Sequence, residues 1–144
     1  MSVRQSTIKP EFVDFIPERL EAGIIYISER YNTASHKCCC GCDEEVVTPL
    51  TPADWSVQIV RNTISLTPSI GNWSFPCKSH YWIRNNKVVW AGTLSQRQIE
   101  QVRVQDKADK DAYIAAVNLQ KSQQAWPWSV IAKLWQKIKR YWKS

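Results

Sequence analysis

Four of the five cysteines lie in one short segment, His36-Lys37-Cys38-Cys39-Cys40-Gly41-Cys42, and the fifth is Cys77. The two histidines, His36 and His80, fall in the same two stretches of the chain. If these side chains form one site, the two stretches must meet in space, because thiolate and imidazole ligands converge on a single metal ion. This requirement constrains the fold more than any other feature of the sequence.

The cysteines do not form a convincing disulfide framework. Their number is odd, three of them are consecutive, and the N-terminal residues lack the apolar stretch of a secretory signal. Adjacent cysteines cannot easily reach normal disulfide geometry with each other. We therefore expect a cytoplasmic protein with reduced thiols, which in such clusters more often hold metal. The sequence contains no apolar run of about 18 residues, so we expect no membrane span.

A structural zinc ion takes four thiolate or imidazole ligands in tetrahedral geometry. A turn at Gly41 can direct Cys40 and Cys42 at one point, and Cys77 with His80 can supply the other half of the site. Cys38 competes with His80 and gives a four-cysteine alternative. Buried thiols without metal are a third interpretation, but three adjacent cysteines beside glycine and lysine are poor core material.

The two stretches contain more candidate ligands than the four that zinc takes, which suggests a second kind of site. A serine hydroxyl becomes a nucleophile when a neighbouring imidazole takes its proton. His36, Ser79 and His80 would approach one another if the two stretches met. The backbone N–H groups of residues 69–74, or the Asn72 side chain, could stabilise an oxyanion. Spacing alone favours the simpler alternative, in which Ser79 and His36 only form structural hydrogen bonds. An acid would have to orient the imidazole, and the sequence does not distinguish between the candidates Glu29, Asp43, Glu44 and Glu45.

The first 94 residues read as short strands joined by tight turns. Residues 23–28 form a β-branched run of strand length, and residues 45–50 contain a proline that suits an edge strand. Alternating patterns around the two-residue turns Arg61-Asn62 and Asn85-Asn86 predict two hairpins. Two further stretches are expected to be connections, residues 29–35 and 68–76.

The chain changes character after Gly92. Ser95 and Gln98 have the spacing of a capping box, and residues 99–124 contain neither glycine nor proline. Pro127 predicts a break and the first turn of a second helix. We therefore predict an α+β fold. It consists of a small antiparallel β body with a cysteine-rich zinc site (1–94), a charged helix (95–125) and a basic, tryptophan-rich amphipathic helix (126–144).

Most of the net charge belongs to the last segment. Of the net charge of +6, residues 126–144 carry +5 and residues 1–125 carry +1. The segment could pack its apolar face on the β body, or it could contact a membrane, a nucleic acid or an acidic partner protein. Its apolar side chains recur at helical spacing: Ile131, Leu134, Trp135, Ile138 and Trp142.

Three motifs carry a family resemblance. They are His36-x-Cys38-x-Cys40-Gly41-Cys42, then Pro68-Ser-Ile-Gly-Asn-Trp-Ser-Phe-Pro-Cys77-x-Ser79-His80-Tyr-Trp-Ile-Arg, and finally Val88-Val-Trp-Ala. With these motifs, residues 12–94 resemble the bacterial domain-of-unknown-function family 6527. Members of that family occur beside bacterial genes for E1-like, E2-like and ubiquitin-like proteins, in a setting of antiphage defence. There they look like the peptidase component.

The resemblance implies a small peptidase or isopeptidase-like hydrolase that processes or removes a ubiquitin-like protein. His36, Ser79 and His80 stand on the motif positions and are the expected catalytic residues, with a serine nucleophile favoured over zinc-bound water. The expected partners are the ubiquitin-like protein and its conjugates, with E1-like and E2-like proteins as further candidates. The alternative is a non-enzymatic zinc-binding interaction module whose basic helix contacts nucleic acid, membrane or a partner protein. The expected zinc ligands are Cys38, Cys40, Cys42 and Cys77.

Overall fold

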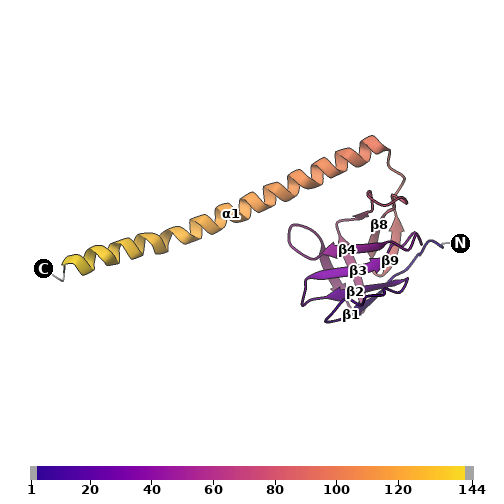
Figure 1. Cartoon of the computed structure of the whole chain (residues 1–144), viewed down its shortest axis with the longest axis horizontal. Helices are drawn as coiled ribbons and strands as arrows, with labels where there is room; N and C mark the ends of the chain where they lie inside the picture. Colours follow the sequence, from indigo (N-terminus) through magenta and orange to yellow (C-terminus); the bar gives the residue numbers. More distant parts are fainter. Residues whose placement is uncertain (1–2, 142–144) are drawn as a thin grey trace. The chain divides into compact units, whose positions relative to one another are not determined.

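The structure is a computed structural model that describes residues 3–141, without the side chains of residues 125–129 and 141. The chain divides after Gln101 into two units, one built from nine strands and one from most of a long helix. Figure 1 shows the strands β1 to β4 side by side in one sheet. The described elements are β1 (Lys9–Phe12), β2 (Ile24–Ser28), β3 (Thr33–Lys37), β4 (Glu45–Pro49), β5 (Ser56–Val60), β6 (Thr63–Thr67), β7 (Ile70–Gly71), β8 (His80–Arg84), β9 (Lys87–Trp90) and α1 (Gln96–Tyr141).

The largest sheet has the order β1-β2-β3-β4, and all its pairs are antiparallel except β1 with β2. As predicted, the strand that contains Pro49 is at the edge, where its missing N–H costs no ladder bond. The sequence did not predict β3, whose first residues fall in the stretch expected to be a connection. β3 lacks a run of β-branched or aromatic residues, and pairing with strands on both sides keeps it extended.

Both predicted hairpins are present. Arg61 turns β5 into β6 with φ of 56°, and Asn85 and Asn86 turn β8 into β9 with φ of 49° and 63°. Two positive φ values in succession define a type I′ turn, which asparagine tolerates better than most residues. The expected loop 68–76 contains the short strand β7, which pairs with the start of β8.

Asn86 joins three segments that are far apart in the sequence. Its N–H donates to Ile64 O at 3.0 Å, its Oδ1 accepts from Ile64 N–H at 2.8 Å, and its carbonyl accepts from Ile8 N–H at 2.8 Å. The turn of the second hairpin thereby fixes β6 and the N-terminal segment against β8 and β9. The core beneath them is formed by buried side chains, the largest being Tyr81, Ile8, Ile25, Ile64, Leu66, Ile70 and Ile83.

The C-terminal part is one continuous helix, where two helices were expected. The predicted capping box opens it, because Ser95 N–H donates to Gln98 Oε1 at 2.8 Å and Gln98 N–H donates to Ser95 Oγ at 3.4 Å. Pro127, the residue expected to break the helix, lies inside it. Proline removes one helical hydrogen bond but does not force termination. No helix in the described part of the chain is long and apolar enough to cross a membrane.

Candidate metal centre and serine–histidine pair

Two backbone segments bring the cysteines together. The chain leaves β3 in a tight turn, where Cys38 N–H donates to Glu44 O and Gly41, at φ of 85°, donates its N–H to Cys38 O. The second segment precedes β8 and turns at Lys78, whose φ is 45°. The predicted meeting of the two stretches is therefore present in the structure.

The sulfur atoms of Cys38, Cys40, Cys42 and Cys77 all lie within 4.8 Å of one another. The Sγ atom of Cys38 lies 3.4 Å from that of Cys40 and 3.9 Å from that of Cys77, which in turn lies 3.7 Å from that of Cys42. Zinc–sulfur bonds of about 2.3 Å at tetrahedral angles separate the sulfurs by about 3.8 Å. The four thiols therefore fit a single metal ion, and His80 is not part of this group.

The protonation of the thiols differs across the cluster. Burial raises the pKa of Cys40 and Cys42. Burial also acts to raise the pKa of Cys77, but hydrogen bonds from Ser79 and from neighbouring thiols outweigh it and lower that pKa to about 7. Cys77 thus loses its proton more readily than Cys40 or Cys42, and the thiolate is the form that binds metal.

Cys39 lies apart from the cluster, as expected. Its side chain is fully buried in the core. Burial raises its pKa to about 12, although a hydrogen bond with Tyr81 acts in the opposite direction. A buried thiol of this kind behaves as a small apolar side chain.

Ser79 belongs to the surroundings of the cysteines. Its Oγ lies 3.1 Å from Cys38 Sγ and 3.5 Å from Cys77 Sγ, and it accepts a hydrogen bond of 2.9 Å from Asn72 Nδ2. Neither histidine is among its hydrogen-bond partners in the described part of the chain. The Asn72 amide, considered above as an oxyanion donor, is used to hold this hydroxyl.

His36 is sealed in the core, with an exposed fraction of 0 %. Its Nε2 forms a hydrogen bond of 2.9 Å with Tyr81 Oη, and its Nδ1 has no partner among the described residues, so no acid orients it. Burial lowers its pKa to about 4, which keeps the imidazole neutral. In this position His36 supports packing around Tyr81 and does not reach Ser79.

His80 contacts a serine, but this serine is Ser69 and not Ser79, the serine expected from the sequence. Its Nε2 lies 3.0 Å from Ser69 Oγ, and its ring lies against Trp73 and Trp82 at centroid distances of 4.9 and 5.3 Å. Burial lowers its pKa, so the imidazole stays neutral at pH values at which an exposed histidine would take up a proton. His80 Nδ1 is buried without a partner among the described residues.

Ser69 is the candidate that sequence reasoning missed as a nucleophile. The pairing of Gly71 with His80 brings Ser69 close to the imidazole. A strand of two residues leaves too weak a pattern to be predicted, so this proximity was not foreseen. An extended Ser-Ile-Gly stretch facing a histidine on a paired strand is the signal that could have found it.

Ser69 also lines a pocket with a volume of about 480 Å³. This size lies within the range of small-ligand sites. Most of the residues that line the pocket are polar. The Arg84 guanidinium, which lies 5.3 Å from the Trp82 ring centre, makes one side of the pocket cationic. The other lining residues are Gln58, Ser65, Leu66, Thr67, Pro68 and Asn85.

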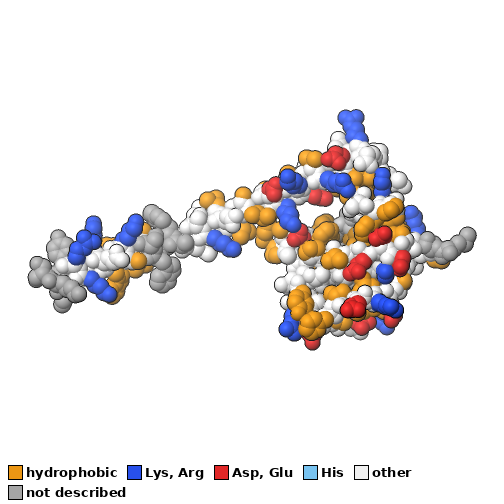
Figure 2. Space-filling view, viewed as in Figure 1, with side chains coloured by type: hydrophobic (Ala, Val, Ile, Leu, Met, Phe, Trp, Pro, Cys, Tyr) orange, Lys and Arg blue, Asp and Glu red, His pale blue; other side chains and the backbone are white. Residues whose placement is uncertain are grey.

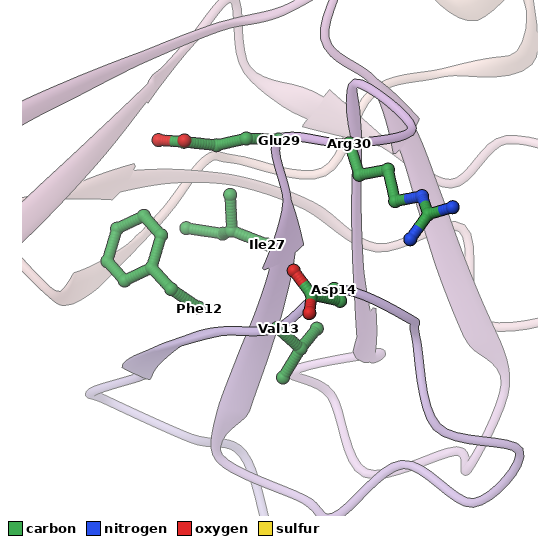
Figure 3. A pocket seen from close by; sticks show the side chains of 6 residues that line it. All are labelled: Phe12, Val13, Asp14, Ile27, Glu29 and Arg30. Carbon is green, nitrogen blue, oxygen red and sulfur yellow. The ribbon is translucent and has the colours of Figure 1, made fainter.

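A separate pocket of about 390 Å³ lies between the end of β1 and the end of β2. Figure 3 shows Ile27 between Phe12 and Asp14, with Glu29 and Arg30 above them and Val13 below. None of the predicted catalytic or metal-binding residues lines it. It contributes nothing to the serine–histidine pair.

The fold and site define a class: a small α+β domain in which a four-cysteine cluster lies near a serine–imidazole pair. A family model described as bacterial ubiquitination-like system serine protease (BubE) matches residues 12–91, more than half of the chain. The chain therefore belongs to this family, in agreement with the resemblance noted in the sequence. Neither a curated protein nor a solved structure matches it.

Proposed function

We propose that the chain is a serine peptidase that processes or removes a bacterial ubiquitin-like protein, with Ser69 as nucleophile and His80 as general base. The observation that carries this proposal is the 3.0 Å contact between Ser69 Oγ and His80 Nε2 beside a pocket. The family description names a serine protease, and Ser69 is a serine with an imidazole in hydrogen-bonding reach.

The chemistry follows from this contact. His80 Nε2 accepts the Ser69 hydroxyl proton as Oγ attacks the scissile carbonyl carbon, which forms a tetrahedral oxyanion. His80 then returns the proton to the leaving amine, and an acyl-enzyme remains for water to hydrolyse. The neutral imidazole required for the first step is favoured because burial lowers the pKa of His80. The ubiquitin-like protein supplies the acyl group through its C-terminal residue.

We further propose that the ion held by Cys38, Cys40, Cys42 and Cys77 is zinc in a structural role. The spacing of the four sulfurs supports this, since four thiolates complete a tetrahedral site and leave no position for water. The ion would tie the turn after β3 to the segment before β8. It would thereby fix the start of the strand that carries His80.

The sequence-based alternative, with Ser79 as nucleophile and His36 as a catalytic partner, is separated from ours by two serine variants. We expect Ser69→Ala to lower kcat/KM at least about 10³-fold, with metal content unchanged, because it removes the nucleophile. Ser79→Ala should keep most of the activity. Removal of the Ser79 hydroxyl should instead weaken metal binding about 10- to 100-fold, because this hydroxyl lies 3.1 Å from Cys38 Sγ.

Cleavage is measured on a ubiquitin-like protein fused through its C-terminus to a reporter, and metal content is measured on the same samples. Ser74→Ala is the matched control, since Ser74 is an exposed serine of the same loop. Full activity in Ser69→Ala together with its loss in Ser79→Ala would transfer the nucleophile to Ser79. Full activity in both variants would remove the serine mechanism.

A further inference from the structure

The last described turns of α1 expose large apolar side chains. The exposed fraction is 53 % for Leu134, 61 % for Trp135 and 52 % for Ile138, and Val130 and Ile131 are exposed as well. At 3.6 residues per turn these five side chains occupy an arc of about 140°. A contiguous apolar face of this kind on a helix marks a surface that binds something.

The charges around this face all have the same sign. Lys137 and Lys139 border the apolar arc on its two sides, and Lys133 and Arg140 lie opposite it. Asp111 is the last acidic residue of the sequence, so all charged side chains in residues 112–144 are cationic. On the visible face in Figure 2, this end of α1 carries apolar and basic side chains and no acidic ones. The complementary surface is therefore anionic and has an apolar layer beneath its charges.

A continuous helix–helix seam fits the pattern less well. The residues between Asp106 and Asp111 and between Asn118 and Gln124 are mostly polar and exposed, so the apolar positions are not sustained along α1. A coiled coil needs such positions over several consecutive heptads. Nucleic acid would use the cations but leave the apolar arc in water.

We propose that this end of α1 lies on an anionic phospholipid bilayer, with Ile131, Leu134, Trp135 and Ile138 in the apolar boundary and the flanking lysines at the headgroups. Amphipathic helices with bordering lysines and an exposed tryptophan bind in the plane of such an interface. Lysine stems can extend past the apolar edge and leave their ammonium groups among the phosphates. This inference does not depend on the peptidase reaction.

The test is flotation of the full chain with vesicles of equimolar phosphatidylglycerol and phosphatidylcholine, compared with vesicles of phosphatidylcholine alone. We expect binding to the anionic vesicles to be at least tenfold stronger. Trp135→Ala should weaken it about tenfold because it removes the largest apolar side chain of the arc. Lys137→Gln should weaken it about fivefold, as expected for one cation at an anionic surface.

Gln136→Ala is the matched control, because Gln136 lies on the polar side of the same turn and its variant should bind as the unaltered chain does. Equal binding to both kinds of vesicle, or none to either, would overturn the proposal. So would duplex DNA binding that persists in Trp135→Ala in the absence of vesicle binding. Self-association that Trp135→Ala abolishes, again without vesicle binding, would assign the face to a second copy of the chain.

Discussion

At the scale of single residues, Tyr81 is the side chain on which the buried polar groups near the cysteine turn depend. Its hydroxyl contacts His36 Nε2 at 2.9 Å and accepts the N–H of Cys39 at 3.5 Å. Since His36 Nδ1 already lacks a partner, Tyr81→Phe would leave the whole imidazole unsatisfied in the core. We expect a loss of about 1–3 kcal/mol in the free energy of unfolding, measured by urea denaturation, with metal content unchanged. The control is Tyr26→Phe, a buried tyrosine of β2; equal stability of the two variants would contradict this role.

The cysteines make a second prediction at this scale. Cys40→Ser should abolish stoichiometric metal binding and destabilise the β unit, because three thiolates hold a structural ion far less tightly than four. Cys39→Ala should retain the metal, since Cys39 lies in the core and outside the cluster. Elemental analysis and thermal unfolding of both variants check this. Full metal retention in Cys40→Ser would remove the four-cysteine site.

At the scale of elements, the short strand β7 positions the rings around His80. A Cβ atom at Gly71 would lie 2.5 Å from Trp73 Cε2, so the indole can pack there only over a glycine. We expect Gly71→Ala to displace Trp73 and with it the His80 ring, and to lower kcat/KM about 10- to 100-fold without loss of metal. Gly92→Ala is the control, because a Cβ there meets nothing within 4 Å. Equal activity of the two variants would show that Trp73 does not position the imidazole.

At the scale of the whole molecule, the two proposed functions belong to separate units. The β unit holds the cysteine cluster, the serine–imidazole pair and the pocket, while the end of α1 carries the exposed apolar and cationic face. Variants at Trp135 or Lys137 should therefore change vesicle binding and leave the rate of cleavage in free solution unaltered. A change in activity that parallels the loss of vesicle binding would instead link the two functions.

The sequence alone determined the features that depend on local chemistry. The two hairpins follow from alternating patterns and from residues that accept positive φ, and the capping box from Ser95 and Gln98. The sequence identified the four cysteines as the expected ligands, but it left His80 open as an alternative to Cys38, and the folded chain brings the four sulfurs together. The family was recognisable from the same motifs.

Only the tertiary structure decided how each polar side chain is used. Ser79 and His36 are near the cluster in sequence, but burial and nearer partners occupy them. Ser69 meets His80, 11 residues further along the chain, because a two-residue strand that has no sequence pattern of its own pairs with β8. Pro127 lies within a continuous helix because a proline weakens a helix without always ending it. Local patterns specify which backbone a segment prefers, whereas the partner of a side chain depends on which segments pack together.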